Sequence, residues 1–121
     1  MNMGGPNDLE ETGPFLSNLF PDREIIELPF MQDTLGQMIA KRRTPKVRDQ
    51  YDQIGGKSPI RSWTEKQAAG LDARLNDAEG RFGKGLDLIS PLKSYVMFRY
   101  ARPLAEETLL QMADDGIEHA V

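Results

Sequence analysis

Residues 95–100, with the letters YVMFRY, have stronger β propensity than any other segment of the chain. Aromatic and β-branched side chains of this kind are enriched in strands, so the segment predicts a strand. A second, shorter strand is predicted at residues 25–28, where Pro29 ends it. Helical patterns flank both segments, and strands that alternate with helices indicate βαβ units and a parallel sheet. The predicted fold class is therefore α/β.

The first predicted helix begins at Gly13 and Pro14, because proline is well placed in the first turn of a helix. Four large apolar residues then fall on one helical face: Phe15, Leu16, Leu19 and Phe20. Pro21 is expected to end this helix.

Two further helices are predicted to meet at Thr44 and Pro45. The first has three apolar residues at helical spacing, Leu35, Met38 and Ile39. Its last turn holds the cations of residues 41–43, which suit the negative end of the helix dipole. The second has an apolar stripe formed by Val47, Tyr51 and Ile54. The glycines at positions 55 and 56 are expected to close it, because they adopt positive φ readily.

A fourth helix is predicted to open at Thr64, because Thr64 and Gln67 have the spacing of a capping box. It is expected to continue to about Glu79, with Leu71 and Leu75 facing inward. Residues 80–85 are predicted to form a flexible loop. The last helix is expected to begin at Pro103 and to end at Gly116, and its apolar residues are Leu104, Leu109 and Met112.

The size and charge of the chain limit the classes of function. A chain of 121 residues is one domain at most, and a net charge of −4 argues against general nucleic-acid binding. With no cysteine, the chain has neither a disulfide nor a thiolate metal site. No apolar run approaches the roughly 20 residues that span a bilayer, and no signal or transit segment is visible. Residues 2–6 read as a turn after a strand, and residues 117–121 as the start of one, so we expect a fold truncated at both ends.

Residues 39–60 concentrate groups that could hold a ligand. Three cations are followed by Tyr51 and by a Gly-Gly-x-Ser loop that ends at Ser58. A guanidinium fork, a phenol and a loop hydroxyl suit a flat ligand that carries carboxylates. From the residues alone, each has a simpler reading. Arg43 could be a solvated helix end, Tyr51 a half-buried helix residue and Ser58 a turn hydroxyl.

The amino-acid sequence of residues 39–60 closely resembles that of ferrochelatases. Further segments match the same family in the same order along the chain, at residues 2–6, 15–20, 28–29, 63–64 and 98–107. The resemblance implies part of a chelatase-type Rossmann-like domain, with a parallel sheet and flanking helices. Residues 1–121 would be the N-terminal part of that single domain. They would contain a porphyrin-pocket lip at about 14–60 and a strand and helix at about 94–116.

The resemblance implies an activity, substrates and a location. Ferrochelatases insert ferrous iron into protoporphyrin IX to form protohaem, the last step of haem biosynthesis. The resemblance further implies a homodimer at full length and a peripheral position on the matrix side of the inner mitochondrial membrane. It implies no cofactor and no metal ligand within this chain, since any iron–sulfur cluster would need cysteines from outside it. No nucleic-acid partner is expected.

Six residues match positions that act in the family. Arg43 resembles the arginine that binds a porphyrin propionate, and Tyr51 and Ser58 resemble hydrogen-bonding partners of the porphyrin. Met3, Arg99 and Tyr100 resemble residues of the active-site wall. From the residues alone, Met3 could simply pack in a turn, and Arg99 could instead pair with a nearby carboxylate.

The chain also departs from the family pattern. Lys57 stands where the family usually has a glycine, and residues 80–92 match poorly. The catalytic histidine and the acidic iron-site residues of the family would lie beyond Val121, and His119 does not match that histidine. We therefore expect the isolated chain to be inactive. The alternatives are a non-catalytic porphyrin-binding paralogue and a membrane-surface module that uses the apolar lip and the basic residues 41–43.

Overall fold

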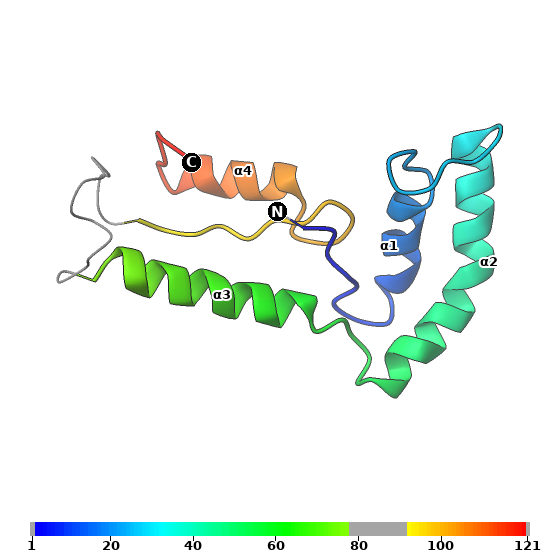
Figure 1. Ribbon diagram of the computed structural model, residues 1–121, viewed down its shortest axis with the longest axis horizontal. Helices are drawn as coiled ribbons and strands as arrows, with labels where there is room; N and C mark the ends of the chain where they lie inside the picture. The colour runs from blue at the N-terminus through cyan, green and yellow to red at the C-terminus, as the bar shows by residue number, and fades with distance from the viewer. Residues whose placement is uncertain (1, 78–91, 121) are drawn as a thin grey trace.

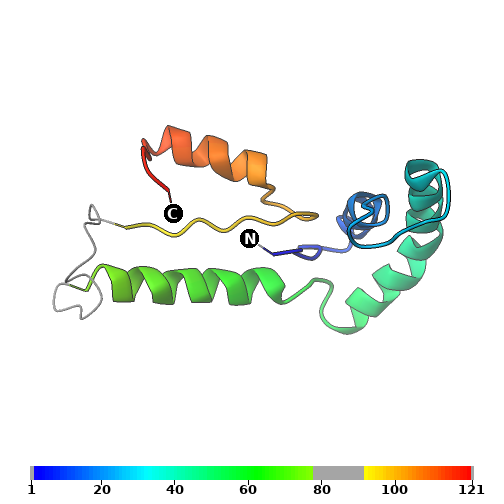
Figure 2. The ribbon, with the colours of Figure 1, turned by 45° about the horizontal axis from the view of Figure 1, so that its top comes forward.

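The computed structural model describes residues 2–77 and 92–120, and this part of the chain contains four helices. They are α1 (Thr12–Leu19), α2 (Gln32–Gln53), α3 (Ile60–Leu75) and α4 (Ala105–Asp114). Figure 1 shows an elongated arrangement in which α1 and α2 lie at one end and α3 and α4 at the other. An extended segment, residues 92–98, runs between α3 and α4 (Figures 1 and 2).

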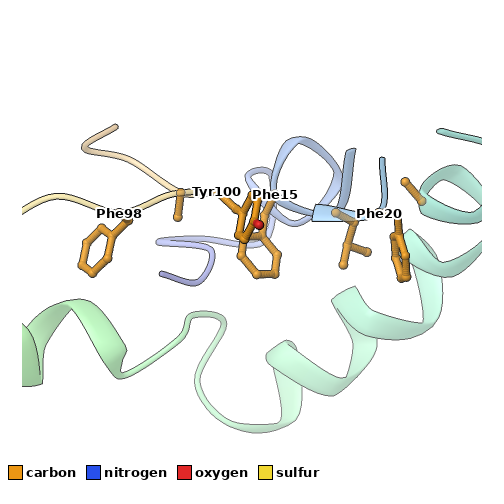
Figure 3. Close-up of a cluster of buried hydrophobic side chains, with 7 residues drawn as sticks. Phe15, Phe20, Phe98 and Tyr100 are labelled. Atoms are coloured by element: carbon orange, nitrogen blue, oxygen red, sulfur yellow. The ribbon is translucent and has the colours of Figure 1, made fainter. Parts of the chain in front are cut away.

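The predicted apolar face of α1 is confirmed. Phe15, Leu16 and Phe20 are buried, and Leu19 is half-buried against them. Figure 3 shows Phe98, Tyr100, Phe15 and Phe20 in succession from the extended segment towards α2. Burial of this face holds α1 against α2 and the residues around Phe98 and Tyr100.

α1 and α2 pack closely because Gly36 has no side chain. A Cβ at Gly36 would lie 2.8 Å from the Cα of Pro21 and 2.9 Å from the carbonyl carbon of Phe20. Ala40, one turn further along α2, is completely buried. The contact between the two helices therefore depends on small residues along one face of α2.

The predicted break at Thr44 and Pro45 is wrong, because α2 continues through Pro45. Proline lacks the N–H that would bond to the carbonyl one turn earlier, and such positions bend a helix without necessarily ending it. Figure 1 shows α2 bending along its length. The Thr44 hydroxyl donates a further hydrogen bond to the Ala40 carbonyl at 2.8 Å, next to the bend. The glycine closure is confirmed, since Gly55 and Gly56 have φ of 97° and 79°.

The strand predicted at residues 25–28 does not form. The N–H groups of Ile25 and Ile26 donate to the Asp22 carbonyl at 3.2 and 3.0 Å, which makes a turn. The side-chain amide of Gln32 accepts from the Leu28 N–H at 2.9 Å and donates to the Ile26 carbonyl at 2.8 Å. A side chain thus supplies the hydrogen bonds that a neighbouring strand would have supplied.

The strand predicted at residues 95–100 is extended, but the described residues give it no ladder. Its β pairing is limited to isolated parallel bridges from Phe98 to Asn2 and to Leu104. A strand requires a continuous neighbour to share its hydrogen bonds. Within residues 2–77 and 92–120 only short pieces of chain lie beside it, so no parallel sheet is observed there.

α3 begins at Ile60, four residues before the predicted start, and it ends at Leu75. Thr64 is therefore inside the helix, where its hydroxyl donates to the Ile60 carbonyl at 2.9 Å, and the predicted capping box is wrong. Leu71, expected to face inward, is 51% exposed, whereas Leu75 is half-buried. Polar side chains hold α3 to the extended segment. Asp72 accepts from the Ser94 N–H at 2.7 Å, and Asn76 bonds to both backbone groups of Leu92.

The helix predicted between Pro103 and Gly116 is confirmed as α4, and its first residue is Ala105. The carboxylate of Glu107 accepts from the Leu104 N–H at 3.0 Å and so caps the helix. Gly116 has φ of 73°, in agreement with the predicted end. The buried hydroxyl of Thr108 donates to the Val96 carbonyl at 3.1 Å, which attaches α4 to the extended segment. Leu109, by contrast, is exposed.

The loop predicted at residues 80–85 lies outside the described residues. None of the helices in residues 2–77 and 92–120 combines the length and the apolar character needed to cross a membrane.

Candidate functional site

Residues 2–6, which we call the N-terminal loop, lie at the centre of the candidate site. The Arg99 N–H donates to the Asn2 carbonyl at 2.9 Å, and the Tyr100 N–H donates to the Met3 carbonyl at 3.1 Å. Gly4 has φ of 78°, and a Cβ there would lie 2.7 Å from the Cβ of Phe98. Glycine therefore permits both the turn and the close approach of the two segments. As a result, Met3, Arg99 and Tyr100 are neighbours.

Tyr51 and Ser58 meet the same loop at Gly5. A Cβ at Gly5 would lie 2.5 Å from the Ser58 Oγ and 3.8 Å from the Tyr51 Oη. The Ser58 N–H donates to the Pro6 carbonyl at 2.8 Å, and its side chain is buried rather than free in a turn. Burial also raises the pKa of Tyr51, so the phenol keeps its proton near neutral pH.

Five of the six predicted residues therefore belong to the N-terminal loop or lie against it: Met3, Tyr51, Ser58, Arg99 and Tyr100. They come from three segments that are distant in sequence. Of these side chains, that of Met3 is 45% exposed, so its thioether is open to a ligand.

Arg43 is the exception. Its guanidinium carbon lies 5.7 Å from the centre of the Phe20 ring, which is a cation–π distance. It forms no ion pair with any residue in the described ranges, so its charge is free to meet an anion. Arg43 and Tyr51 are eight residues apart on α2, which corresponds to about 12 Å along the helix.

Arg99 forms ion pairs with two carboxylates in the segment between α1 and α2. Its Nη2 lies 2.6 Å from the Asp22 Oδ2, and its Nη1 lies 2.6 Å from the Glu24 Oε2. The Tyr100 Oη donates to the same Asp22 Oδ2 at 2.7 Å. The guanidinium also lies over the Tyr100 ring, at 5.4 Å from its centre. The alternative reading of Arg99, as a partner of nearby carboxylates, thus describes its contacts in this structure.

Burial and the hydrogen bond to Asp22 raise the pKa of Tyr100 to about 12. The hydrogen bond from Tyr100 and the one from the Glu24 N–H hold the pKa of Asp22 below its usual value, and the Arg99 charge acts in the same direction. Near neutral pH the group therefore consists of a neutral phenol, one cation and two carboxylates. Its net charge is −1.

The surface contains shallow hollows, but the predicted residues do not line them. One hollow, of about 560 Å³, lies between the end of α1 and the start of α2 and includes Asp22 and Gln32. Another, of about 420 Å³, lies where Gly13 faces Thr44. Within the part of the chain that the structure describes, no group of three or more His, Cys, Asp or Glu side chains could hold a metal ion.

Sequence reasoning missed Asp22, Glu24 and Gly5. Asp22 directly follows Pro21, and its place after a helix gives no sign of a role in a site. The possibility that Arg99 pairs with a carboxylate was recognised, but nothing in the spacing indicates which of the 19 acidic residues it would choose. The glycine contact could be found only once Ser58 was known to fold back onto the N-terminal loop.

Comparison with known proteins agrees with the resemblance in residues 39–60. A family model described as ferrochelatase matches residues 1–121. The chain is 46% identical over 121 residues to "Ferrochelatase, mitochondrial" of Bos taurus and 44% identical to the protein of the same name from Homo sapiens. Each match covers 100% of this chain and 27% of the relative.

A further relative, "Ferrochelatase" of Nostoc punctiforme, is 45% identical over 123 residues, which cover 100% of this chain and 29% of the relative. The chain therefore spans less than a third of the length of these relatives. Its identity to the protein from Nostoc punctiforme lies between its identities to the two relatives named mitochondrial, so the level of identity does not distinguish between locations.

Proposed function

The chain belongs to the ferrochelatase family, and from this premise we propose that it forms the porphyrin-binding part of an enzyme that inserts ferrous iron into protoporphyrin IX. The product would be protohaem, and the process haem biosynthesis. Iron and porphyrin are the two substrates, and residues 1–121 need no resident cofactor for the role proposed here.

One observation carries the proposal beyond family membership: five of the six candidate residues meet at the N-terminal loop. The backbone bonds from Arg99 and Tyr100 to the loop align the wall residues beside Met3. Gly5 brings Ser58 and Tyr51 to the same loop from the other side. Groups from three distant segments gather here, as expected of a binding site held by a rigid scaffold.

Arg43 would bind a propionate of the porphyrin. Its charge has no carboxylate partner in the described ranges, and it lies about 12 Å from Tyr51 along α2. A macrocycle can span that distance, whereas a single sugar or amino acid cannot. A guanidinium fork matches a carboxylate in shape as well as charge, which favours arginine over lysine at this position.

Insertion of iron requires the loss of two pyrrole protons. The acceptor needs a pKa near the working pH, which histidine provides. His119 is exposed beyond α4, so we propose that the base is supplied from outside residues 1–121. Within the chain, Met3 would pack on the macrocycle as a soft, adaptable side chain, and Arg99 and Tyr100 would complete the wall.

We also propose that the extended segment is a strand of a parallel sheet in a Rossmann-like domain. Its bridge to Asn2 is parallel. The backbone groups of Lys93 and Tyr95 have no hydrogen-bond partner within the described ranges, so one edge of the segment is available for pairing.

The membrane, location and oligomer are part of the same proposal. Phe30, Met31 and Met38 are more than 60% exposed. Phe30 and Met31 stand at the start of α2, and Met38 lies within one turn of the basic residues 41–43. Apolar side chains beside cations suit an anionic membrane surface. Together with the names of the mitochondrial relatives, this supports a peripheral position on a mitochondrial membrane. The matrix side of the inner membrane is proposed from the family resemblance alone. A homodimer is proposed from the family alone.

The experiment compares Arg43→Ala with Arg42→Ala in the complete gene product. Both variants remove one exposed arginine from the same helix, but only Arg43 is assigned a propionate. Protoporphyrin binding is measured by fluorescence quenching, and zinc insertion by the emission of the zinc porphyrin. Arg43→Ala should weaken binding by about tenfold or more, because a charge-assisted hydrogen bond contributes about 1.5–3 kcal/mol. Arg42→Ala should bind as the wild type does.

Equal effects of the two variants would reject the role of Arg43. Protoporphyrin binding without metal insertion by the complete gene product would favour the non-catalytic porphyrin-binding role. Liposome binding that survives Arg43→Ala and Tyr51→Phe, with no affinity for porphyrin, would favour the membrane-surface module. Metal insertion by residues 1–121 alone would show that the base lies within them.

A further inference from the structure

Asp22 joins the two residues that form the proposed active-site wall. Its Oδ2 accepts the Tyr100 hydroxyl at 2.7 Å and the Arg99 Nη2 at 2.6 Å. Its Oδ1 accepts the Glu24 N–H at 2.9 Å, so both carboxylate oxygens are held. We propose that Asp22 is a positioning residue that fixes Arg99 and Tyr100 for metal insertion. The inference rests on the proposed function, since it assumes that these two residues face the porphyrin.

The hydrogen bond to Asp22 limits the hydrogen bonds that the Tyr100 hydroxyl can make with other groups. The phenol has one proton, and that proton is donated to the carboxylate. Towards any other group the Tyr100 oxygen can then act only as an acceptor. The ring is 3% exposed, so the hydroxyl cannot easily rotate into solvent to change this assignment.

Asp22 also orients Arg99 without enclosing it. Two of the five guanidinium N–H groups point to Asp22 and Glu24, and one face of the guanidinium lies over the Tyr100 ring. The Arg99 side chain nevertheless remains 42% exposed, while that of Asp22 is 18% exposed. The carboxylate is therefore the sheltered partner, and the cation presents its remaining donors outward.

The position of Asp22 in the fold links two parts of the proposed pocket. Asp22 follows α1 in the segment that leads to the exposed lip residues Phe30 and Met31, whereas Tyr100 is 78 residues away in sequence. The side chain of Asp22 thus connects the lip to the end of the extended segment.

The test compares Asp22→Asn with Glu27→Gln in the complete gene product. Each replaces one carboxylate by its amide in the segment between α1 and α2. Glu27 is exposed, and the ion pairs of Arg99 and the hydroxyl bond of Tyr100 go to Asp22 and Glu24 instead. For Asp22→Asn we expect kcat for zinc insertion to fall by about tenfold or more, with KM changed less than about threefold. Glu27→Gln should change neither parameter.

A second readout separates positioning from general damage to the fold. The chain has three tyrosines, so the difference in tyrosinate absorbance between each protein and its Tyr100→Phe counterpart is used to follow the ionisation of Tyr100. Loss of the Asp22 charge should lower the pKa of Tyr100. Asp22→Asn should also have a smaller effect on kcat in a Tyr100→Phe background, because the two changes act on one contact. If Asp22→Asn does not fold, Asp22→Glu replaces it, and the displaced carboxylate should still lower kcat while circular dichroism is unchanged.

The possible failures are distinguishable. If Arg99→Lys and Tyr100→Phe impair metal insertion while the folded Asp22 variants match Glu27→Gln, the positioning role is rejected and the proposed function stands. If Arg99→Lys and Tyr100→Phe both retain full activity, the proposed role of the wall itself is rejected.

Discussion

Gly36→Ala should destabilise the protein although it introduces a better helix former. In a helix interior, alanine is favoured over glycine by about 0.5–1 kcal/mol. At Gly36, however, the new Cβ would lie 2.8 Å from both the N and the Cα of Pro21. These are backbone atoms, so no rotamer change can relieve the overlap, and α1 must move away from α2.

The magnitude follows from these two opposing contributions. Overpacking of a close contact costs about 1–3 kcal/mol, and the upper half of that range applies where the neighbour is backbone. After subtraction of the helix propensity, the expected net loss is about 1–2.5 kcal/mol. It should be concentrated in α1 and α2, because the described helices make no other close contact with one another.

Gly70→Ala is the matched control. Gly70 lies inside α3, and a Cβ there would have no neighbour within 4 Å. The same substitution should therefore stabilise α3 by about 0.5–1 kcal/mol. Hydrogen exchange measured on peptides from each helix gives the two opening free energies separately. If Gly36→Ala increased the protection of α2 as Gly70→Ala increases that of α3, the steric argument would be refuted.

Two further predictions concern polar contacts. The folded state keeps the Tyr100 proton to about pH 12, whereas an unfolded tyrosine ionises near pH 10, so the contribution of Tyr100 to stability should be lost as pH rises between these values. The contribution of Asp22 should be lost as pH falls below its unfolded pKa of about 4, since its folded pKa is lowered. Urea midpoints across pH should show both losses, and Tyr100→Phe should make the alkaline loss smaller, although the raised pKa values of Tyr51 and Tyr95 still contribute to it. Gln32→Ala should lower the free energy of unfolding by about 1–3 kcal/mol, because it leaves buried backbone groups without partners. Gln37→Ala, which removes one exposed hydrogen bond, should stay within about 1 kcal/mol of the wild type in the same urea experiment.

Elements defined by local chemistry could be predicted from the sequence. The proline at the first turn of α1, the apolar face that follows it and the glycines after α2 all act within a few residues of their position. α4 was predicted for the same reason, and its start differs by only two residues from the expected one.

Elements that depend on a distant partner could not be predicted correctly. Residues 25–28 have the composition of a strand, but the Gln32 amide bonds to their backbone in place of another strand. Pro45 was expected to divide α2. Instead, Gly36 and Ala40 pack closely on one side of the helix, and α2 continues through Pro45 with a bend. At Thr64 the capping pattern was present, but the helix had already begun at Ile60.

The candidate site shows the same division. The family resemblance identified six residues, and five of them meet at the N-terminal loop. The contacts that hold them could not be read from the sequence, because Asp22 is 78 residues from Tyr100, and no local pattern indicates such a contact.

The continuity of α2 through Pro45 has a mechanical consequence. Because α2 is one helix of 22 residues, any tilt about its close contact at Gly36 would also move its far end. Tyr51 lies fifteen residues beyond that contact, about 22 Å along the helix, so a tilt of only about 5° would displace it by about 2 Å. The contact at Gly36 therefore affects the position of the Tyr51 side chain, about 22 Å away along the helix.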